Sequence, residues 1–210
     1  MPTKVLHQLR VAAVLLAGGE SSRMGESKAL LPWTTGEPLV AYHVRALHQA
    51  GYSPIIAVLG HAPEEINKAL PKDIDITVVV NQHYALGRCS SIVTGVSQIA
   101  TPDIDAFVIA SVDQPRSIEM LRTLRETWEH GQPSIAMPSY KHRSGHPPLF
   151  SSTLITEVLQ VTEEEQGLRQ VIRDFDHDLL FVNVEDPLTL ANLNTREDYE
   201  TALRIAKDLA

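Results

Sequence analysis

Apolar residues follow two alternating patterns along this chain. Short runs rich in β-branched residues are typical of buried strands, and they occupy residues 11–16, 55–59, 76–80, 106–110, 134–137 and 179–182. Between these runs, apolar residues recur every three or four positions, as on the buried face of a helix, at Val40, Val44 and Leu47, at Ile118, Leu121, Leu124 and Trp128, and at Tyr199, Ala202, Leu203, Ala206 and Leu209. The alternation predicts an α/β fold in which crossover helices connect a mostly parallel sheet.

The chain shows no sign of division into parts. No internal repeat or Pro/Gly-rich linker interrupts its 210 residues, a length close to that of one α/β domain, so we expect a single domain over residues 1–210. Thr195 and Asp198 have the spacing of a capping box, with Asp in place of the usual Glu, and this predicts that the last helix begins there.

Composition narrows the class of protein. The sequence contains neither an apolar run long enough for a membrane span nor a signal-peptide pattern, so we expect a cytoplasmic protein without a membrane partner. A formal net charge of −8 argues against a nucleic-acid partner, because duplex binding needs a basic surface. The single cysteine, Cys89, excludes a disulfide framework and a thiolate metal cluster.

The most informative segment directly follows the first predicted strand. It reads Leu-Ala-Gly-Gly-Glu-Ser-Ser-Arg-Met-Gly over residues 16–25, and Lys28 comes three residues later. Gly18, Gly19 and Gly25 permit backbone conformations that turn successive N–H groups toward an anion. Arg23 and Lys28 add two positive charges, so the segment predicts a loop that binds a triphosphate. An ordinary strand-to-helix turn with two solvated cations is the alternative.

The spacing of this loop differs from the two commonest nucleotide motifs. Five residues lie between Gly19 and Gly25, and Glu26 follows, whereas a P-loop has four intervening residues and then Gly-Lys-Ser/Thr. The Gly-x-Gly-x-x-Gly dinucleotide motif is also absent. The run instead resembles the signature Leu-Ala-(Gly/Ala)-Gly-x-Ser-x-Arg-Met-Gly of the nucleotidyltransferases that make molybdenum-cofactor dinucleotides.

Asp113 follows another predicted strand, in the order Ser-Val-Asp-Gln-Pro over residues 111–115. A carboxylate at the end of a parallel strand would lie near the triphosphate, and Mg²⁺ prefers one or two carboxylates together with phosphate oxygens and water. Asp113 is therefore a candidate metal ligand. The alternative is an aspartate that caps a helix starting near Arg116.

Further segments are similar to the cytidylyltransferase branch of the same family. They are Asn81 with Gly87, Ser90, Ser91 and Gly95, the segment 113–115, and Gly-His-Pro-Pro-Leu-Phe at 145–150. Residues 166–172 and 192–199 resemble the family's last two motifs, with Asn192 in place of the usual aspartate. Gly18 is the residue that looks instead like the guanylyltransferase branch.

Two polar loops follow later strands. Residues 140–148 carry His142, Arg143 and His146, and we expect Arg143 and His146 to bind an anionic acceptor. A zinc site at the two histidines is disfavoured, because the intervening loop does not aim them together and no further ligand is near in sequence. The three glutamates at 163–165 are expected to be a solvated approach to a helix.

The resemblance extends in family order from Leu16 to Tyr199 and implies a three-layer, Rossmann-like (glycosyltransferase-A-like) nucleotidyltransferase domain. It further implies Mg²⁺-dependent transfer of CMP from CTP to the phosphate of molybdopterin or molybdenum cofactor, with release of pyrophosphate. A molybdoenzyme that receives the product is a further implied partner.

The implied roles are distributed over the motifs. Arg23, Lys28 and Asp113 would be catalytic, with Asp113 and Asn192 at the metal. The nucleotide would be bound by Leu16, Ala17, Gly18, Gly19, Ser21, Ser22, Arg23, Lys28, Asn81, Ser90 and Ser91. Two alternatives stay open: a transferase of the same fold that uses GTP or a sugar phosphate, and a non-catalytic cofactor-binding chaperone, which Asn192 favours.

Overall fold

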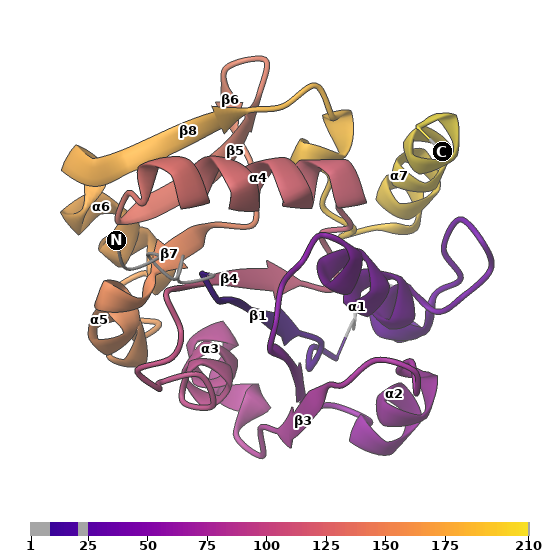
Figure 1. Cartoon of the computed structure of the whole chain (residues 1–210). Helices are drawn as coiled ribbons and strands as arrows, with labels where there is room; N and C mark the ends of the chain where they lie inside the picture. Colours follow the sequence, from indigo (N-terminus) through magenta and orange to yellow (C-terminus); the bar gives the residue numbers. More distant parts are fainter. Residues whose placement is uncertain (1–8, 21–24, 210) are drawn as a thin grey trace, which may run out of the picture.

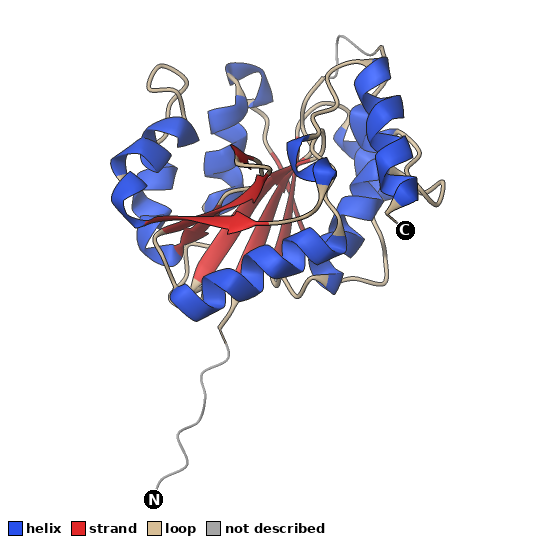
Figure 2. Cartoon of the chain, turned by 90° about the horizontal axis from the view of Figure 1, so that it is seen from above, coloured by secondary structure: helices blue, strands red, loops and turns tan. Residues whose placement is uncertain are grey.

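The computed structural model, which describes residues 9–20 and 25–209, contains a mixed eight-stranded sheet with helices on both faces (Figures 1 and 2). The strands are β1 Val11–Leu16, β2 Ile55–Leu59, β3 Thr77–Val80, β4 Ala106–Ser111, β5 Ile135–Tyr140, β6 Arg143–Ser144, β7 Leu149–Ser151 and β8 Leu179–Asn183. The helices are α1 Leu39–Gln49, α2 Pro63–Ala69, α3 Arg88–Val96, α4 Ile118–Gly131, α5 Ile155–Leu159, α6 Leu168–Asp174 and α7 Arg196–Asp208. Short 3-10 turns are η1 Lys28–Leu30, η2 Tyr84–Leu86, η3 Ser152–Leu154, η4 Asp176–Asp178 and η5 Pro187–Leu190.

The strand order is β3-β2-β1-β4-β7-β5-β6, and β8 pairs with β5. The pairs β3–β2, β2–β1, β1–β4 and β5–β8 are parallel, whereas β7 runs antiparallel to both of its neighbours. All six predicted strands are present, with shifts of a few residues at their ends, so the mostly parallel sheet predicted from the sequence is confirmed.

Alternate residues of the central strand β1 point to opposite faces of the sheet and enter two separate cores. Val11, Ala13 and Leu15 pack in the cluster that includes α1, α2, α4 and α7. The intervening Val14 and Leu16 pack in a second cluster with α3, α5 and α6. A strand buried on both faces is apolar throughout, which explains why this segment reads as a continuous apolar run. The result is the predicted three-layer arrangement.

Strand β7 was not among the strands predicted from the sequence. Leu149 and Phe150 are completely buried, and the Phe150 ring stacks on Phe107 of β4 with 5.6 Å between ring centroids. A strand of three residues is too short to show a periodicity of its own. Because β7 is antiparallel to β4, the chain preceding it passes the carboxyl end of β4, and Ile109 N–H donates to Pro148 O at 3.2 Å.

Helix α7 begins as predicted. Thr195 Oγ1 accepts from the N–H of Asp198, and the Asp198 carboxylate accepts from the N–H of Thr195, so the capping box is complete. Tyr199 is buried and its hydroxyl donates to Pro32 O, which fastens the helix to the chain after η1. The predicted apolar stripe is shorter than expected at its end, because the helix stops at Asp208 and Leu209 is 50% exposed.

No helix in the described part of the chain combines the length and apolar character that crossing a membrane requires.

Helix α3 lies unusually near the sheet at Gly95. A Cβ added there would lie 2.4 Å from Val14 Cγ1 and 2.7 Å from Val58 Cγ2, both in strand interiors. Such distances are below van der Waals contact, so only glycine allows the helix to sit at this depth. The depth matters because α3 begins beside the carboxyl ends of β1 and β2.

We therefore expect Gly95→Ala to lower the free energy of unfolding by about 1–3 kcal/mol, the usual cost of overpacking a core. Gly131→Ala is the matched control, because a Cβ at Gly131 would meet only Pro133 Cδ at 3.7 Å. That control should be neutral or gain about 0.5–1 kcal/mol from reduced backbone entropy. Urea unfolding of both variants measures the difference, and equal stabilities would contradict the close packing of α3.

Candidate functional site

Two predicted functional loops meet at the carboxyl ends of β1 and β4. The strands are paired in register so that Leu16 lies opposite Ser111, and the N–H of Val112 donates to Leu16 O at 2.9 Å. The glycine-containing loop after β1 and the Asp113 loop after β4 therefore start side by side. In open parallel sheets this end is where ligands bind.

The glycine-containing loop is shaped by packing as much as by backbone freedom. A Cβ at Gly18 would lie 2.8 Å from the backbone nitrogen of Gly60, so the two loops approach too closely for a side chain. Gly25 has a φ of +71°, as the sequence analysis expected, whereas neither Gly18 nor Gly19 is in the left-handed region. Of the three glycines that the sequence expects to permit such conformations, Gly25 is the one that adopts a positive φ, and Gly18 is needed for the close approach to Gly60.

A cavity of about 270 Å³ opens at this end of the sheet. It is lined by Leu16, Ala17, Gly18, Gly19, Lys28, Ala29, Tyr84, Gly87, Arg88, Ser91, Ser111, Val112 and Asp113. We call it the first cavity. Ser21, Ser22 and Arg23, which the sequence predicts to bind nucleotide, lie outside the described residues.

Asp113 and Lys28 face each other in the first cavity. Asp113 Oδ2 lies 3.7 Å from Lys28 Nζ, and Asp113 Oδ1 is buried without a hydrogen-bond partner. The alternative capping role does not apply, because Ser117 is the N-cap of α4 and its Oγ accepts from the N–H of Met120. A buried carboxylate oxygen that lacks a donor suits a hard cation, so Asp113 fits the metal-ligand prediction.

Asn192 is brought to the same place by the backbone. The N–H of Leu193 donates to Asp113 O at 2.8 Å, which puts the segment after η5 directly beside the Asp113 loop, and Asn192 itself is exposed. No group of three or more His, Cys, Asp or Glu side chains suited to a metal occurs among residues 9–20 and 25–209. A cation held here would therefore take most of its ligands from phosphate oxygens and water.

Asn81, Ser90 and Ser91 form one hydrogen-bonded group. Asn81 Nδ2 donates to Ser90 Oγ at 2.9 Å and to Ser91 Oγ at 3.0 Å, and its Oδ1 accepts from the N–H of His83. Asn81 is 3% exposed, whereas Ser91 lines the first cavity. Of the three, Ser91 is placed to meet a ligand, and Asn81 holds the start of α3 in position.

A second cavity of about 410 Å³ adjoins the first, because Arg88 lines both. Its lining includes His146 and Arg169. Burial, together with the positive charges of Arg88 and Arg116, lowers the pKa of His146 from 6.5 to about 4. His146 Nδ1 is buried without a partner, so a neutral imidazole lies between arginines at this cavity.

Arg143 is not at either cavity. It lies on β6, where its backbone pairs with Tyr140 in a hairpin that projects at the top of Figure 1, and its side chain is exposed. Lys141 and His142 both have positive φ angles, and they form the turn that reverses the chain between β5 and β6. The structure thus separates the two residues that the sequence placed in one acceptor site.

Several cavity residues were missed in the sequence. Arg88 is the first residue of α3 and Arg169 lies in α6. Both fall within segments that resemble the family, but the sequence analysis assigned neither of them a role. Glu163 was expected to be merely solvated, but its Oε1 accepts from the N–H of Cys89 at 2.7 Å and so satisfies a donor at the start of α3. Its position in a run of glutamates gave no signal of this contact.

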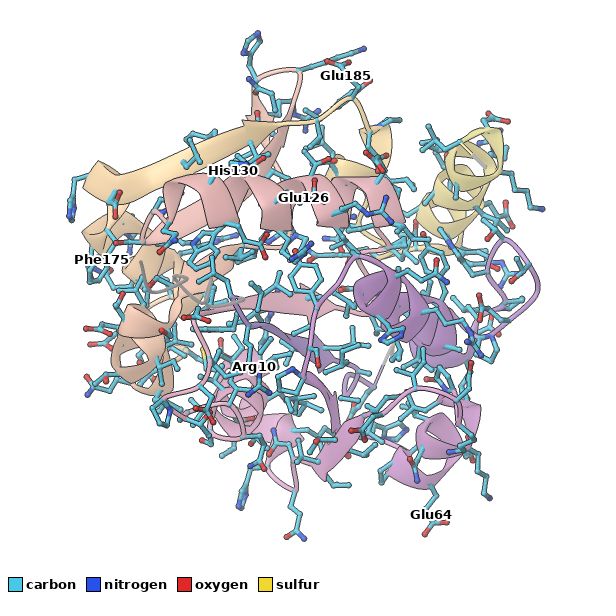
Figure 3. The ribbon with its side chains drawn as sticks, viewed as in Figure 1. Arg10, Glu64, Glu126, His130, Phe175 and Glu185 are labelled. Carbon is cyan, nitrogen blue, oxygen red and sulfur yellow. The ribbon has the colours of Figure 1, made fainter. Side chains whose placement is uncertain are left out.

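Acidic side chains lie both at the edges of the molecule and at the cavities, where Asp113 and Glu163 are found. Figure 3 shows Glu64 on α2 pointing outward at the lower edge and Glu185 at the upper edge. Lys28, Arg88 and Arg169, by contrast, line the two cavities. The net charge of −8 is therefore compatible with anion binding at a local group of cations.

The chain is similar to known proteins in both sequence and structure. The MobA-like NTP transferase domain model matches residues 13–179. The molybdenum cofactor cytidylyltransferase of Escherichia coli (strain K12) is 27% identical over 193 residues, which cover 91% of this chain and 95% of that protein. A probable molybdenum cofactor guanylyltransferase of Rhodopirellula baltica is 26% identical over 191 residues and 88% of each chain.

A nucleotidyl transferase of known structure from Methanothermobacter thermautotroptrophicus is 25% identical and superposes with a TM-score of 0.79. The similarity covers 95% of this chain and 99% of that one.

The backbone before Asp113 is held by a buried histidine of α1. His43 Nε2 lies 3.1 Å from Val112 O, and the side chain is 3% exposed. Burial lowers the pKa of His43 to about 4, partly opposed by this hydrogen bond. The unfolded chain, with an ordinary histidine pKa near 6.5, then binds more protons than the folded chain once the pH falls below that value.

Stability should therefore fall as the pH drops from about 6.5 toward 4. The His43 contribution between pH 7 and pH 5 is about 2 kcal/mol. His43→Gln keeps a donor for Val112 O but does not titrate, so urea unfolding at both pH values should show a correspondingly smaller loss. His130→Gln, on the exposed end of α4, is the matched control and should retain the full loss. The same loss in all three proteins would disprove a buried neutral His43.

Proposed function

Because the chain belongs to the MobA-like NTP transferase family and is a nucleotidyltransferase, we propose that it transfers CMP from CTP to the phosphate of molybdopterin or of its molybdenum-loaded form. Pyrophosphate is the second product. Its relatives of both named kinds, cytidylyltransferase and guanylyltransferase, support the molybdenum-cofactor acceptor. Family membership favours an enzyme over the cofactor-binding chaperone that Asn192 had left open.

One observation carries the proposal: an unsatisfied, buried carboxylate oxygen of Asp113 beside Lys28, at the base of a cavity bordered by the glycine-containing loop. Asp113 and the adjacent Asn192 would hold Mg²⁺. When bound, the ion supplies positive charge that neutralises the phosphate oxygens of the nucleotide. This role suits a site with a single carboxylate, since the nucleotide itself brings the remaining oxygen ligands.

The proposed reaction is a displacement at the α-phosphorus of CTP. A terminal phosphate oxygen of the acceptor forms the new bond, the bond to the bridging oxygen of the β-phosphate breaks, and pyrophosphate leaves with that electron pair. No protein nucleophile is required. Catalysis then consists of positioning the two phosphates and stabilising charge, which is how enzymes accelerate phosphoryl chemistry.

Different residues of the predicted nucleotide site would carry out these two tasks. Lys28 and Arg23 would neutralise the triphosphate, while the backbone at Gly18 and Gly19 allows the phosphates to approach without side-chain obstruction. Ser91 Oγ accepts from Asn81 and keeps its own proton for a ligand oxygen. Ser90 and Asn81 would act through Ser91, and Leu16 and Ala17 would form the apolar wall.

The second cavity is the proposed acceptor site. Arg88 and Arg169 would neutralise the acceptor's phosphate there, and neutral His146 offers a hydrogen-bonding nitrogen at the same wall. Since Arg88 also lines the first cavity, an acceptor phosphate bound beside it would lie at the boundary of the two sites. Arg88 and Arg169 take the role that the sequence had assigned to Arg143.

Cytosine is the proposed base. The segments around Ser90, Asp113 and His146, together with residues 21–23, resemble the cytidylyltransferase branch. Gly18 is the feature that favours a guanylyltransferase, and GTP is accordingly the second candidate. The close approach of Gly18 to Gly60 gives a packing reason for glycine at this position that is independent of the base. Gly18 is therefore weaker support for GTP than the four segments are for CTP.

Lys28→Ala and Asp113→Ala should each lower turnover by about 10²- to 10³-fold, the effect of losing one preorganised charge-stabilising group. Pyrophosphate release with saturating CTP and acceptor measures turnover, and circular dichroism checks the fold. Lys68→Ala, which removes an exposed lysine of α2, is the control and should behave as the unaltered protein. Full turnover in a folded Asp113→Ala protein would rule out the proposed metal ligand.

A direct comparison of CTP, GTP and ATP tests the base and the acceptor together. We expect formation of the cytosine dinucleotide to exceed the other products by at least about 10²-fold, because polar groups set for cytosine would be unpaired with a purine. Mass spectrometry of the products, with and without molybdopterin, is the measurement. A preference for GTP would replace the proposed base, and lack of any molybdopterin product would exclude the proposed acceptor.

A further inference from the structure

Arg116 is a buried cation that the proposed reaction does not use. It is 3% exposed and its guanidinium donates to the backbone rather than to a ligand. Nε donates to His146 O at 2.6 Å, and Nη1 donates to Leu188 O at 2.6 Å and Ala191 O at 3.0 Å. Nη1 also reaches Pro115 O at 2.7 Å. One side chain thus contacts four carbonyl groups.

The carbonyls that Arg116 contacts belong to three separate segments of the site. The partner residues lie 30 to 75 positions away in the sequence, apart from Pro115. Pro115 belongs to the loop of Asp113, His146 borders the second cavity, and Ala191 immediately precedes Asn192. The guanidinium therefore joins the two proposed metal ligands and the proposed acceptor cavity.

Helix α1 contacts the same loop from another side. Tyr42 Oη donates to Arg116 O at 2.8 Å, while His43 contacts Val112 O. The backbone is therefore held on both sides of Asp113, and a third bond reaches Asp113 O from the N–H of Leu193. Buried polar side chains and backbone hydrogen bonds together fix this loop.

Burial of a guanidinium is costly, and it lowers the pKa of Arg116 to about 10, with the charge of Asp186 acting in the opposite direction. The carboxylate of Asp186 is itself engaged by Ser117 Oγ and the N–H of Leu188. The cost of burying this charge offsets part of the stability that its hydrogen bonds contribute, so stability alone is a poor reason for a guanidinium at this position. A planar group with five N–H donors is well suited to joining several carbonyls at fixed angles.

We propose that Arg116 is a positioning residue, which sets the separation of Asp113 from Asn192 and holds His146 at the acceptor cavity. The inference rests on the proposed function, because it needs a metal at Asp113. A purely structural role is the alternative, and it predicts a loss of stability without a change in metal binding.

The test uses Arg116→Met, which removes the donors, and Arg116→Lys, which keeps a charge but cannot reach both His146 O and the carbonyls of Leu188 and Ala191. Arg125→Met is the matched control. The guanidinium of Arg125 also donates to a backbone carbonyl, Ala50 O at 2.8 Å, and pairs with Glu129 away from the two cavities. Electron paramagnetic resonance measures Mn²⁺ binding in the presence of a non-hydrolysable CTP analogue, and steady-state kinetics give kcat and KM.

We expect both Arg116 variants to bind Mn²⁺ at least ~10-fold more weakly and to lose ~10²-fold in kcat, since small misplacements of catalytic groups have effects of this size. KM for CTP should stay within ~3-fold, because the first cavity does not include Arg116. The control should lose stability only. Arg116→Lys decides the matter if Arg116→Met does not fold.

Two results distinguish failure of the positioning role from failure of the proposed function. If the unaltered protein binds Mn²⁺ and turns over while folded Arg116 variants match Arg125→Met in both measurements, the positioning role is overturned and the proposed function survives. If the unaltered protein neither binds Mn²⁺ with the analogue nor releases pyrophosphate, the proposed function fails, and this inference fails with it.

Discussion

The pairing of β1 with β4 is the constraint on which the site depends. Both strands are buried on two faces, and their register places Leu16 opposite Ser111, so the loops that follow them leave the sheet together. The bond from Val112 N–H to Leu16 O extends this pairing by one step beyond the strands. A lysine from one loop and a carboxylate from the other can then meet across a cavity whose floor is rigid.

Around this floor, the backbone is unusually close-packed. Gly18 approaches Gly60, and a Cβ at Gly145 would lie 2.4 Å from Thr189 Cγ2. Loops approach one another closely at these glycines, and polar side chains donate hydrogen bonds to the carbonyl groups that meet there. Arg116 does so for the loops of Asp113 and His146. Two features therefore accommodate this close packing. Glycines leave room where two backbones approach, and the side chain of Arg116 supplies hydrogen-bond donors to the carbonyl groups that meet there.

The sequence was most informative where local pattern and chemistry coincide. The six principal strands, the start of α7 at Thr195 and the two loops that carry Lys28 and Asp113 all follow from periodicity or from residues adjacent in the chain. Contacts between distant segments could not be predicted in this way. Glu163 bonding to Cys89, Arg116 joining three loops and the insertion of β7 beside β4 involve partners dozens of residues apart, and no local pattern distinguishes them. The position of Arg143 could not be predicted for a different reason. Lys141 and His142, both with positive φ, reverse the chain inside a segment whose sequence predicts a single loop.

The insertion of β7 between β4 and β5 also has an evolutionary consequence. The hairpin of β5 and β6 precedes β7, whose pairing with β4 is fixed by buried Leu149 and Phe150. Residues can therefore be gained or lost at the exposed hairpin tip without a change in the β4–β7 register, and so without moving the loop of Asp113. Descendants of this fold can change the length of the hairpin while the cavity at the ends of β1 and β4 keeps its shape. One scaffold thus separates a segment that is free to vary from a segment whose position the sheet fixes.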